Sequence, residues 1–265
     1  NLSMTIISSG GFLPTNSLES IINSKTKEIV FSFMMLFSFF SLLLSYNLFT
    51  IKKKGLSFFQ EDFYLLIYFF VLVLLFFFIF KTPNNFSTIF LALSSSVSNI
   101  GVSIPGSYSN ISFIFLILVI IGGSFFSTSS GIRLVKIYSL FKFSINELAS
   151  HAKPLNIFIN KLEFSEAKLE TKDINKYFIS VLIFVLSLLL LTCLLTISGV
   201  NLESSFKLSI LTLMNTVNSS TYGLNDFNFN DLQYFTKYFL VIFMVIGRVE
   251  LLTLLIILKK FIFKN

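Results

Sequence analysis

The sequence predicts an all-α membrane protein that repeats a unit of helix, re-entrant segment and helix. Of its 265 residues, 54% are hydrophobic and 36 are Phe, which is more apolar surface than a soluble domain of this size can bury. Five apolar stretches approach the roughly 20 residues that an α-helix needs to cross a bilayer. Two connections between them are too apolar for solvated loops and too short for spans.

The basic residues orient these spans. The candidate spans are residues 28–50, 61–80, 111–140, 174–198 and 236–258, the third of them interrupted. Lysines and arginines gather after the first span, between the third and fourth, and after the last. The connections 81–110 and 199–235 contain only Lys81 and Lys207. By the positive-inside rule the basic connections are cytoplasmic. The net charge of +7 therefore reflects membrane orientation, and we predict no nucleic-acid partner.

The two non-basic connections define the re-entrant segment. Residues 82–110 and 201–229 each contain polar residues that can cap a helix, then a short apolar and hydroxyl run, then Ser, Thr, Asn and Gly. Backbone at membrane depth is tolerated where protein buries it or water lines it, which favours a pore-lining role over an ordinary surface loop. Residues 1–20 match the end of such a unit, so we expect the C-terminal part of a longer protein.

The predicted organisation follows from this repeat. It comprises the end of one unit (1–50), a complete unit (51–143), a cytoplasmic connection (144–173) and a second complete unit (174–265).

The ends of the re-entrant segments have the character of a cation filter. A pore that strips water from a cation must replace that water with oxygen, and rings of backbone carbonyls do this without mobile charge. Glycine allows the unusual dihedral angles that turn successive carbonyls the same way. The predicted filter residues are Ser8, Ser9, Gly10 and Gly11 in one segment and Ser98, Asn99, Ile100 and Gly101 in the next.

A polar insert breaks the third span. After Ile121 the sequence reads GGSFFSTSSGIRLVK, residues 122–136. Such an insert must face protein or water, never lipid. It predicts either a helix kink whose hydroxyls bond back to the backbone, or a mobile intramembrane loop beneath the filter. The candidate loop residues are Gly122, Gly123, Ser127, Thr128 and Gly131.

The last span carries Arg248 and Glu250 within an otherwise apolar run. Removing a guanidinium from water is expensive. Snorkelling to the interface at Lys259 would have to cover about 15 Å along the helix. That distance is long for snorkelling, so we predict that Arg248 faces the pore. Glu250 projects from another side of the helix, and its partner stays open.

No catalytic or metal-binding constellation accompanies these features. Cys193 lies alone in an apolar run, and His151 lies in a polar connection. Titratable residues within the spans are almost confined to Arg248 and Glu250, so we expect no enzyme, no cofactor and no metal beyond a transported monovalent cation. The connection 144–173 is either a solvated linker or a docking surface, and it has no phosphate-binding glycine loop.

Three features in combination resemble the Trk/Ktr/HKT family of potassium transporters, and within it the TrkH-type membrane subunit. They are the Gly11 and Gly101 loops, the break at 122–136, and the stretch IGRVELLTLL in the last helix. Members have four helix–pore loop–helix repeats around one pore, of which this sequence would supply the end of the second and all of the third and fourth. The resemblance implies filter glycines at Gly11 and Gly101 and a gating loop at 122–131. It also implies that Arg248 reaches into the permeation path, where it would face a wet cavity, bond to carbonyls and hydroxyls of residues 122–131 and raise the barrier to a cation.

The resemblance also implies potassium uptake across the inner membrane of a bacterium, a homodimer, and a nucleotide-binding cytoplasmic partner of the TrkA type that docks on residues 144–173. It assigns the last filter segment to Thr216, Val217 and Asn218, with Asn218 where members have glycine; a register shift toward Gly223 is the alternative. The competing functions are a sodium-permeable or other monovalent cation pathway, a non-conducting fragment, and a membrane protein of another class.

Overall fold

The chain folds into helices joined by short loops. The computed structural model describes residues 2–11, 21–22, 24–41, 56–78, 86–102, 111–124, 127–152, 171–224, 227 and 229–248. The α-helices are α1 (Leu2–Ile7), α2 (Lys25–Phe39), α4 (Leu56–Phe78), α5 (Phe86–Val97), α6 (Ser112–Ile120), α7 (Leu134–Ala152), α8 (Thr171–Ile197), α9 (Leu202–Leu213) and α10 (Tyr234–Arg248). The shorter elements are the strands β1 (Ile121–Gly122) and β2 (Ile132–Arg133) and the 3-10 helices η1 (Ser220–Tyr222) and η2 (Phe229–Asp231). The predicted helical class is confirmed.

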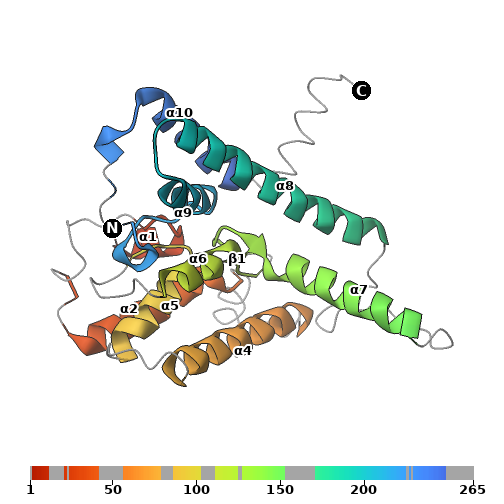
Figure 1. Cartoon of the computed structure of the whole chain (residues 1–265). Coiled ribbons are helices and arrows are strands. Elements are labelled where there is room, and N and C mark those ends of the chain that lie inside the picture. The colour runs from red at the N-terminus through yellow and green to blue at the C-terminus, as the bar shows by residue number, and fades with distance from the viewer. Residues whose placement is uncertain are drawn as a thin grey trace.

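Short helices occupy the middle of the molecule and long ones its outside. In Figure 1, α1, α5, α6 and α9 gather around the centre, while α4, α7 and α8 run along the periphery. α5 and α9 have 12 residues each, and each follows a long helix and precedes another helix. α5 packs against α2, and α9 packs against both α8 and α10. The described elements α4–α5–α6 and α8–α9–α10 therefore share one order of long helix, short buried helix and helix.

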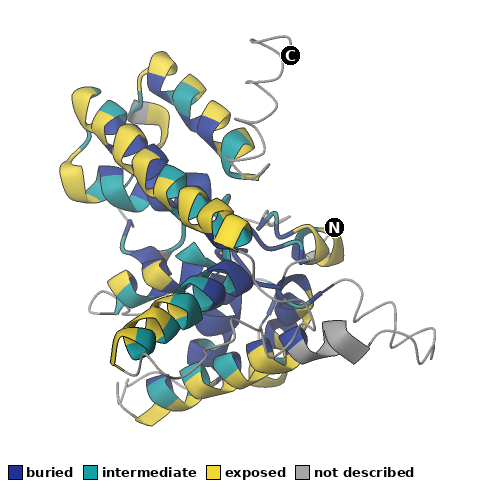
Figure 2. Ribbon diagram, turned by 90° about the vertical axis from the view of Figure 1, so that its right-hand side faces the viewer, coloured by how far each residue is buried: buried dark blue, intermediate teal, exposed yellow. Residues whose placement is uncertain are grey.

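The short helix α5 is buried along most of its length although it carries several serines. The buried residues run almost without interruption from Ser87 to Val97. Ser96 Oγ donates to the Ala92 carbonyl oxygen (2.8 Å), four residues back in the same helix. A local bond of this kind satisfies the Ser96 hydroxyl without a tertiary partner. The buried hydroxyls of Ser87, Ser94 and Ser95 have no hydrogen-bond partner among the described residues. Figure 2 shows this central layer as buried and the outward faces of the peripheral helices as exposed.

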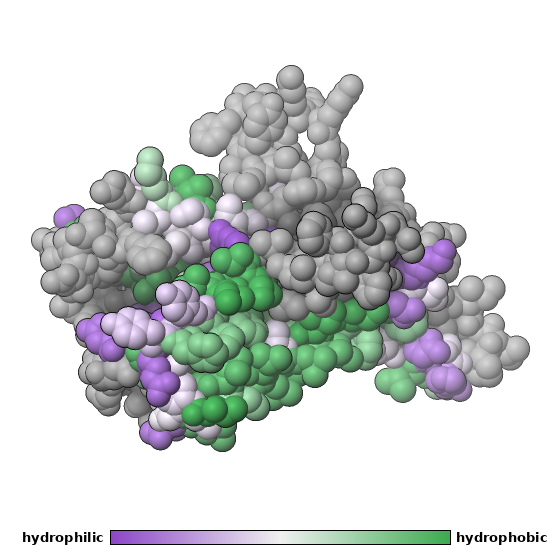
Figure 3. Space-filling view, turned by 90° about the horizontal axis from the view of Figure 1, so that it is seen from above, coloured by the Kyte–Doolittle hydropathy of each residue, from purple (hydrophilic) through white to green (hydrophobic). Residues whose placement is uncertain are grey.

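The outward faces of the long helices are apolar. Within the described residues, two helical segments are long and apolar enough to cross a bilayer, Glu61–Phe78 of α4 and Thr171–Ile197 of α8. Only 28% of each window is buried inside the molecule, whereas the core helix of a soluble protein would be mostly buried. Figure 3 shows a hydrophobic band across the upper face, with hydrophilic residues gathered toward both ends. Such a band matches the hydrocarbon layer of a membrane.

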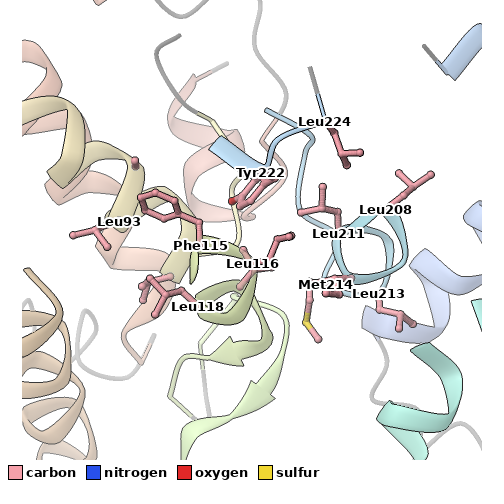
Figure 4. Packing of buried hydrophobic residues seen from close by; sticks show 14 of the residues in the cluster. Leu93, Phe115, Leu116, Leu118, Leu208, Leu211, Leu213, Met214, Tyr222 and Leu224 are labelled. Carbon is pink, nitrogen blue, oxygen red and sulfur yellow. The ribbon is translucent and has the colours of Figure 1, made fainter. Parts of the chain in front are cut away.

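The main core joins the two units. Leu116 and Phe115 of α6, Leu211 of α9 and Tyr222 of η1 belong to one buried cluster, which Figure 4 shows at close range. The Tyr222 hydroxyl lies 3.4 Å from Ser96 Oγ of α5. The segment that follows α9 is thereby packed onto the unit that contains α5 and α6.

The predicted break in the third span is present as a loop. α6 ends at Ile120, and α7 starts at Leu134. Between them β1 and β2 pair in parallel, with Ile121 opposite Ile132 and Gly122 opposite Arg133. The break is thus a loop closed at its base and is not a simple kink. α7 remains helical to residue 152, beyond the predicted boundary at 143. The rest of the cytoplasmic connection (153–170), the ends of the first and last spans, and Glu250 lie outside the described residues.

A buried carboxylate ties the end of α2 to α4, and this contact gives a stability prediction. Asp62 Oδ1 accepts a hydrogen bond from the Ser41 amide (2.9 Å), and Asp62 is 3% exposed. We expect Asp62→Ala to lower the thermal stability of the detergent-purified protein, because an unpaired buried amide costs about 1–3 kcal/mol. Asp62→Asn, which keeps an acceptor oxygen, should lose less. Equal melting temperatures for the two variants would contradict the role of this bond.

Candidate functional site

The loops that follow α1, α5 and α9 fold in the same way. Each helix closes on a residue in the left-handed conformation: Ser9 (φ 49°), Asn99 (φ 60°) and Asn215 (φ 52°). The next amide then donates to a carbonyl five residues back, from Gly10 to Thr5 (2.9 Å), from Ile100 to Ser95 (3.0 Å) and from Thr216 to Leu211 (2.9 Å). This is a Schellman closure of the helix. Because all three loops close in this way, their residues can be aligned by backbone conformation alone.

The alignment corrects the predicted register of the third loop. Gly11 (φ 68°) and Gly101 (φ 80°) lie two residues after the left-handed residue, and the equivalent position after α9 is Val217 rather than Asn218 or Gly223. The resemblance assigned Asn218 to the position where members have glycine, but the asparagine in left-handed geometry is Asn215. Asn218 Nδ2 instead donates to the Leu224 carbonyl oxygen (3.2 Å).

The three loops meet at one point. A Cβ atom added to Gly11 would collide with the Ile100 carbonyl oxygen and would lie 2.6 Å from Val217 Cγ2. A Cβ atom added to Gly101 would collide with the Val217 carbonyl oxygen and lie 2.6 Å from the Val217 amide nitrogen. Glycine alone combines the left-handed backbone with this close approach. Backbone oxygens from two of the loops therefore lie against the glycines of their neighbours.

The loop between β1 and β2 lies against the first of these loops and the end of α2. The Ser124 amide donates to the Phe39 carbonyl oxygen (3.1 Å), and the Ser129 amide donates to the Ser38 carbonyl oxygen (3.1 Å). Ser9 Oγ donates to the Thr128 carbonyl oxygen (2.9 Å). Inside the loop, the Ser127 and Ser129 hydroxyls are 2.9 Å apart. Protein groups therefore satisfy these amides and hydroxyls of the polar insert, as polar backbone at membrane depth requires, whereas the buried Ser124 Oγ has no partner among the described residues.

Arg248 joins the converging loops to the polar insert. Its Nη2 donates to the Ser8 carbonyl oxygen (2.8 Å), and its Nη1 donates to Ser9 Oγ (3.1 Å) and to Ser130 Oγ (3.0 Å). The neighbouring Gly247 explains the placement, because a Cβ atom there would collide with the Leu213 carbonyl oxygen at the end of α9. α10 thus crosses close to α9 and presents Arg248 to the loops. Arg248 is exposed and borders a cavity, but its guanidinium turns toward the converging loops and does not snorkel.

Arg133 is a second arginine at the site, and the sequence interpretation treated it only as an orienting charge. Its Nη1 lies within hydrogen-bonding distance of the Ser124 carbonyl oxygen (2.9 Å), Ser127 Oγ (2.8 Å) and the Ser127 carbonyl oxygen (3.2 Å). The Ser129 carbonyl oxygen is 3.4 Å away. The Arg133 guanidinium therefore holds together the serine oxygens on the inner side of the insert. Its position after the last glycine of a polar insert is the signal that could have identified it.

Removal of Arg133 should loosen the insert. Arg133→Ala leaves the serine carbonyls without their shared donor, so we expect faster hydrogen–deuterium exchange at the amides of Ser124 and Ser129. Arg133→Lys retains a positive donor and should exchange at an intermediate rate, because an ammonium lacks the planar fork. The measurement is exchange mass spectrometry on the peptide that covers residues 122–131. Unchanged exchange in both variants would rule out this role.

The predicted residues thus fall into two connected groups. The converging loops comprise residues 8–11, 98–101 and 216–217. The layer against them comprises residues 122–124 and 127–131 together with Arg248. A cavity of about 670 Å³ borders both groups and is lined by Ser8, Ser9, Gly10, Val217 and Arg248 together with apolar residues of α9 and α10. Among the described residues no group of three His, Cys, Asp or Glu could hold a metal ion.

Comparisons with known proteins agree with this architecture. The crystal structure of the potassium transporter TrkH from Vibrio parahaemolyticus superposes with a TM-score of 0.80 at 20% sequence identity. The match covers 96% of this chain and 56% of the other, so the chain spans little more than half the length of that protein. No curated protein sequence matches the chain. The family model described as "TrkH: Cation transport protein" matches residues 102–263. The chain therefore belongs to the TrkH family of cation transport proteins.

Proposed function

We propose that this chain forms part of a passive pathway for potassium ions across a membrane. One observation carries the proposal: three loops with the same backbone closure meet at a point that an arginine and a polar insert face from one side. The family to which the chain belongs transports cations and contains membrane proteins, not enzymes. The apolar faces of α4 and α8 accordingly lie against lipid.

The converging loops are proposed as the ion filter. A cation that has lost its water needs several oxygens at close range, and main-chain carbonyls held by glycine geometry provide them. The dipoles of α1, α5 and α9 place partial negative charge at these helix ends, which favours a cation. The proposed filter residues are Ser8, Ser9, Gly10, Gly11, Ser98, Asn99, Ile100, Gly101, Thr216 and Val217. Asn218 lies one position beyond the aligned segment.

The insert and Arg248 are proposed as the gate. Residues 122–131, with Gly122, Gly123, Ser127, Thr128 and Gly131, would block the path in the conformation described here. Arg248 would hold them there by its bonds to Ser8, Ser9 and Ser130. A fixed positive charge at this place also opposes the passage of a cation.

The cavity beside the converging loops is the proposed place of a further segment of the pore wall. The cavity lies between residues 8–10 on one side and residues 215–218, α9 and α10 on the other. The resemblance implies four pore loops, and the described chain provides three. We propose that another re-entrant loop of the complete protein occupies this cavity and closes the ring.

The partners and the location are proposed from the resemblance. They are the inner membrane of a bacterium, a homodimer, and a TrkA-type nucleotide-binding subunit on the cytoplasmic side. Most of the expected docking segment, residues 153–170, lies outside the described part of the chain. No cofactor is proposed beyond the transported potassium ion.

The test is potassium uptake by the complete gene product. Cells that lack their own potassium-uptake systems should regain growth at low potassium when the complete gene is expressed. Purified protein in liposomes should take up rubidium, a potassium analogue. Failure of both assays with correctly inserted protein would reject the proposal. Uptake of sodium in preference to rubidium would favour the alternative of a sodium-permeable pathway.

A further inference from the structure

Val217 stands where the two other described loops have glycine. The helix closure after α9 places it in register with Gly11 and Gly101. Unlike both glycines, it does not adopt a positive φ angle. Its carbonyl oxygen lies against Gly101. The loop after α9 therefore differs from the other two at the position where they take the left-handed backbone.

The Val217 side chain extends toward the opposite loop. The Cβ position built on Gly11 lies 2.6 Å from Val217 Cγ2 and 3.1 Å from Val217 Cβ. Val217 is only half-buried and also lines the cavity beside Ser8, Ser9 and Gly10. The isopropyl group thus occupies the space between the loop after α1 and the loop after α9, at the level of the glycines.

We propose that Val217 forms a hydrophobic constriction at the filter level and limits the flux of ions through this protein. The inference rests on the proposed ion pathway. An unhydrated cation gains energy from oxygen and none from methyl groups, and a narrow apolar segment also expels water. At the other two loops an ion meets glycine backbone, whereas here it meets hydrocarbon. Passage then requires the isopropyl group to move aside or the ion to pass with fewer ligands.

Graded substitution at this position tests the proposal in the complete protein. Rubidium uptake into liposomes should rise by roughly tenfold in Val217→Gly, which corresponds to a barrier lowered by about 1.4 kcal/mol. Val217→Ala should give an intermediate increase, and Val217→Leu should fall below the wild type. Val241→Ala is the matched control, because Val241 lies on the neighbouring helix α10, is 59% exposed and does not line this cavity. It should transport like the wild type.

The outcomes separate this inference from the proposed function. If the wild type transports and neither Val217→Gly nor Val217→Ala exceeds it, the constriction is rejected while the pathway stands. If no variant transports, including Val217→Gly, both are rejected. If Val217→Gly transports and the wild type does not, both are supported.

A second measurement does not depend on transport. Val217→Cys, in a background whose native cysteines including Cys193 are replaced, should be modified by silver ion, which is similar in size to potassium. Its modification should be slower when rubidium is present. A cysteine at 217 that does not react with silver ion would place the side chain outside the path and overturn the inference.

Discussion

Gly101→Ala is expected to abolish rubidium uptake, to less than about a tenth of the wild-type rate at equal amounts of inserted protein. The added methyl group would collide with the Val217 carbonyl oxygen and would approach the Val217 amide nitrogen to 2.6 Å. Both neighbours are backbone atoms and cannot rotate away. The two loops must therefore separate, and the carbonyl arrangement proposed as the filter is lost. Uptake of rubidium into liposomes measures the effect.

Gly199→Ala is the matched control for this substitution. Gly199 also has a positive φ angle (92°), but a Cβ atom there would meet no atom within 4 Å. It should cost about 1 kcal/mol of stability from backbone strain alone and leave transport intact. If both alanine variants lose transport equally, general strain and not filter geometry accounts for the result. If neither loses it, the convergence of the loops has no part in conduction.

Arg248→Ala is expected to raise basal ion flux. The guanidinium joins Ser8 and Ser9 of one loop to Ser130 of the insert, so its removal weakens the contacts that hold the insert in the conformation proposed as closed. A hydrogen bond to a charged group contributes about 1.5–3 kcal/mol. A loss of about 2 kcal/mol from the closed state would increase the open population by up to roughly 30-fold. The measurement is the basal rate of rubidium uptake in the absence of any regulatory partner.

Two further variants test whether the increase in flux comes from the lost positive charge or from the lost hydrogen bonds of Arg248. Lys237→Ala removes a positive charge from the same helix, at a residue whose Nζ contacts the Asn230 carbonyl oxygen and the Tyr234 ring, and it should leave the flux unchanged. Arg248→Lys keeps the charge but loses the planar fork, and it should lie between the wild type and alanine. Unchanged flux in well-folded Arg248→Ala protein would remove this residue from the gate.

The sequence was sufficient for the large features because they depend on composition and periodicity. The helical membrane class, the break after Ile121 and the family follow from apolar run lengths and from glycine and serine in unusual places. The convergence of Gly11 and Gly101 was also within reach, because two similar loops one repeat apart predict equivalent positions around one axis. The bond of Arg248 to Ser130 agrees with the predicted contact with residues 122–131, whereas its bonds to Ser8 and Ser9 were not predicted.

The sequence could not predict the local register of the loops or the partners of the side chains, for physical reasons. The end of α9 is set by the conformation of Asn215, and nothing in the string LMNTVN distinguishes the left-handed asparagine at 215 from the one at 218. The assignment therefore missed the equivalence of Val217 by one residue. Arg133 was missed because a basic residue near the cytoplasmic side already had an explanation in topology. Its serine partners become visible only when the insert is folded back on itself.

The parallel pairing of β1 with β2 constrains how the insert can leave its place. Ile121 is fixed opposite Ile132, and Gly122 opposite Arg133, so both ends of the segment are anchored side by side. Close packing between Gly122 and the Ser130 carbonyl oxygen leaves no room there for a larger residue. Displacement by unwinding α6 or α7 would break this ladder. A swing about it would keep the ladder and break, among the described contacts, the lateral bonds to the end of α2, to Ser9 and to Arg248. If the insert is the gate proposed above, we expect it to pivot on this ladder and to move as a single flap.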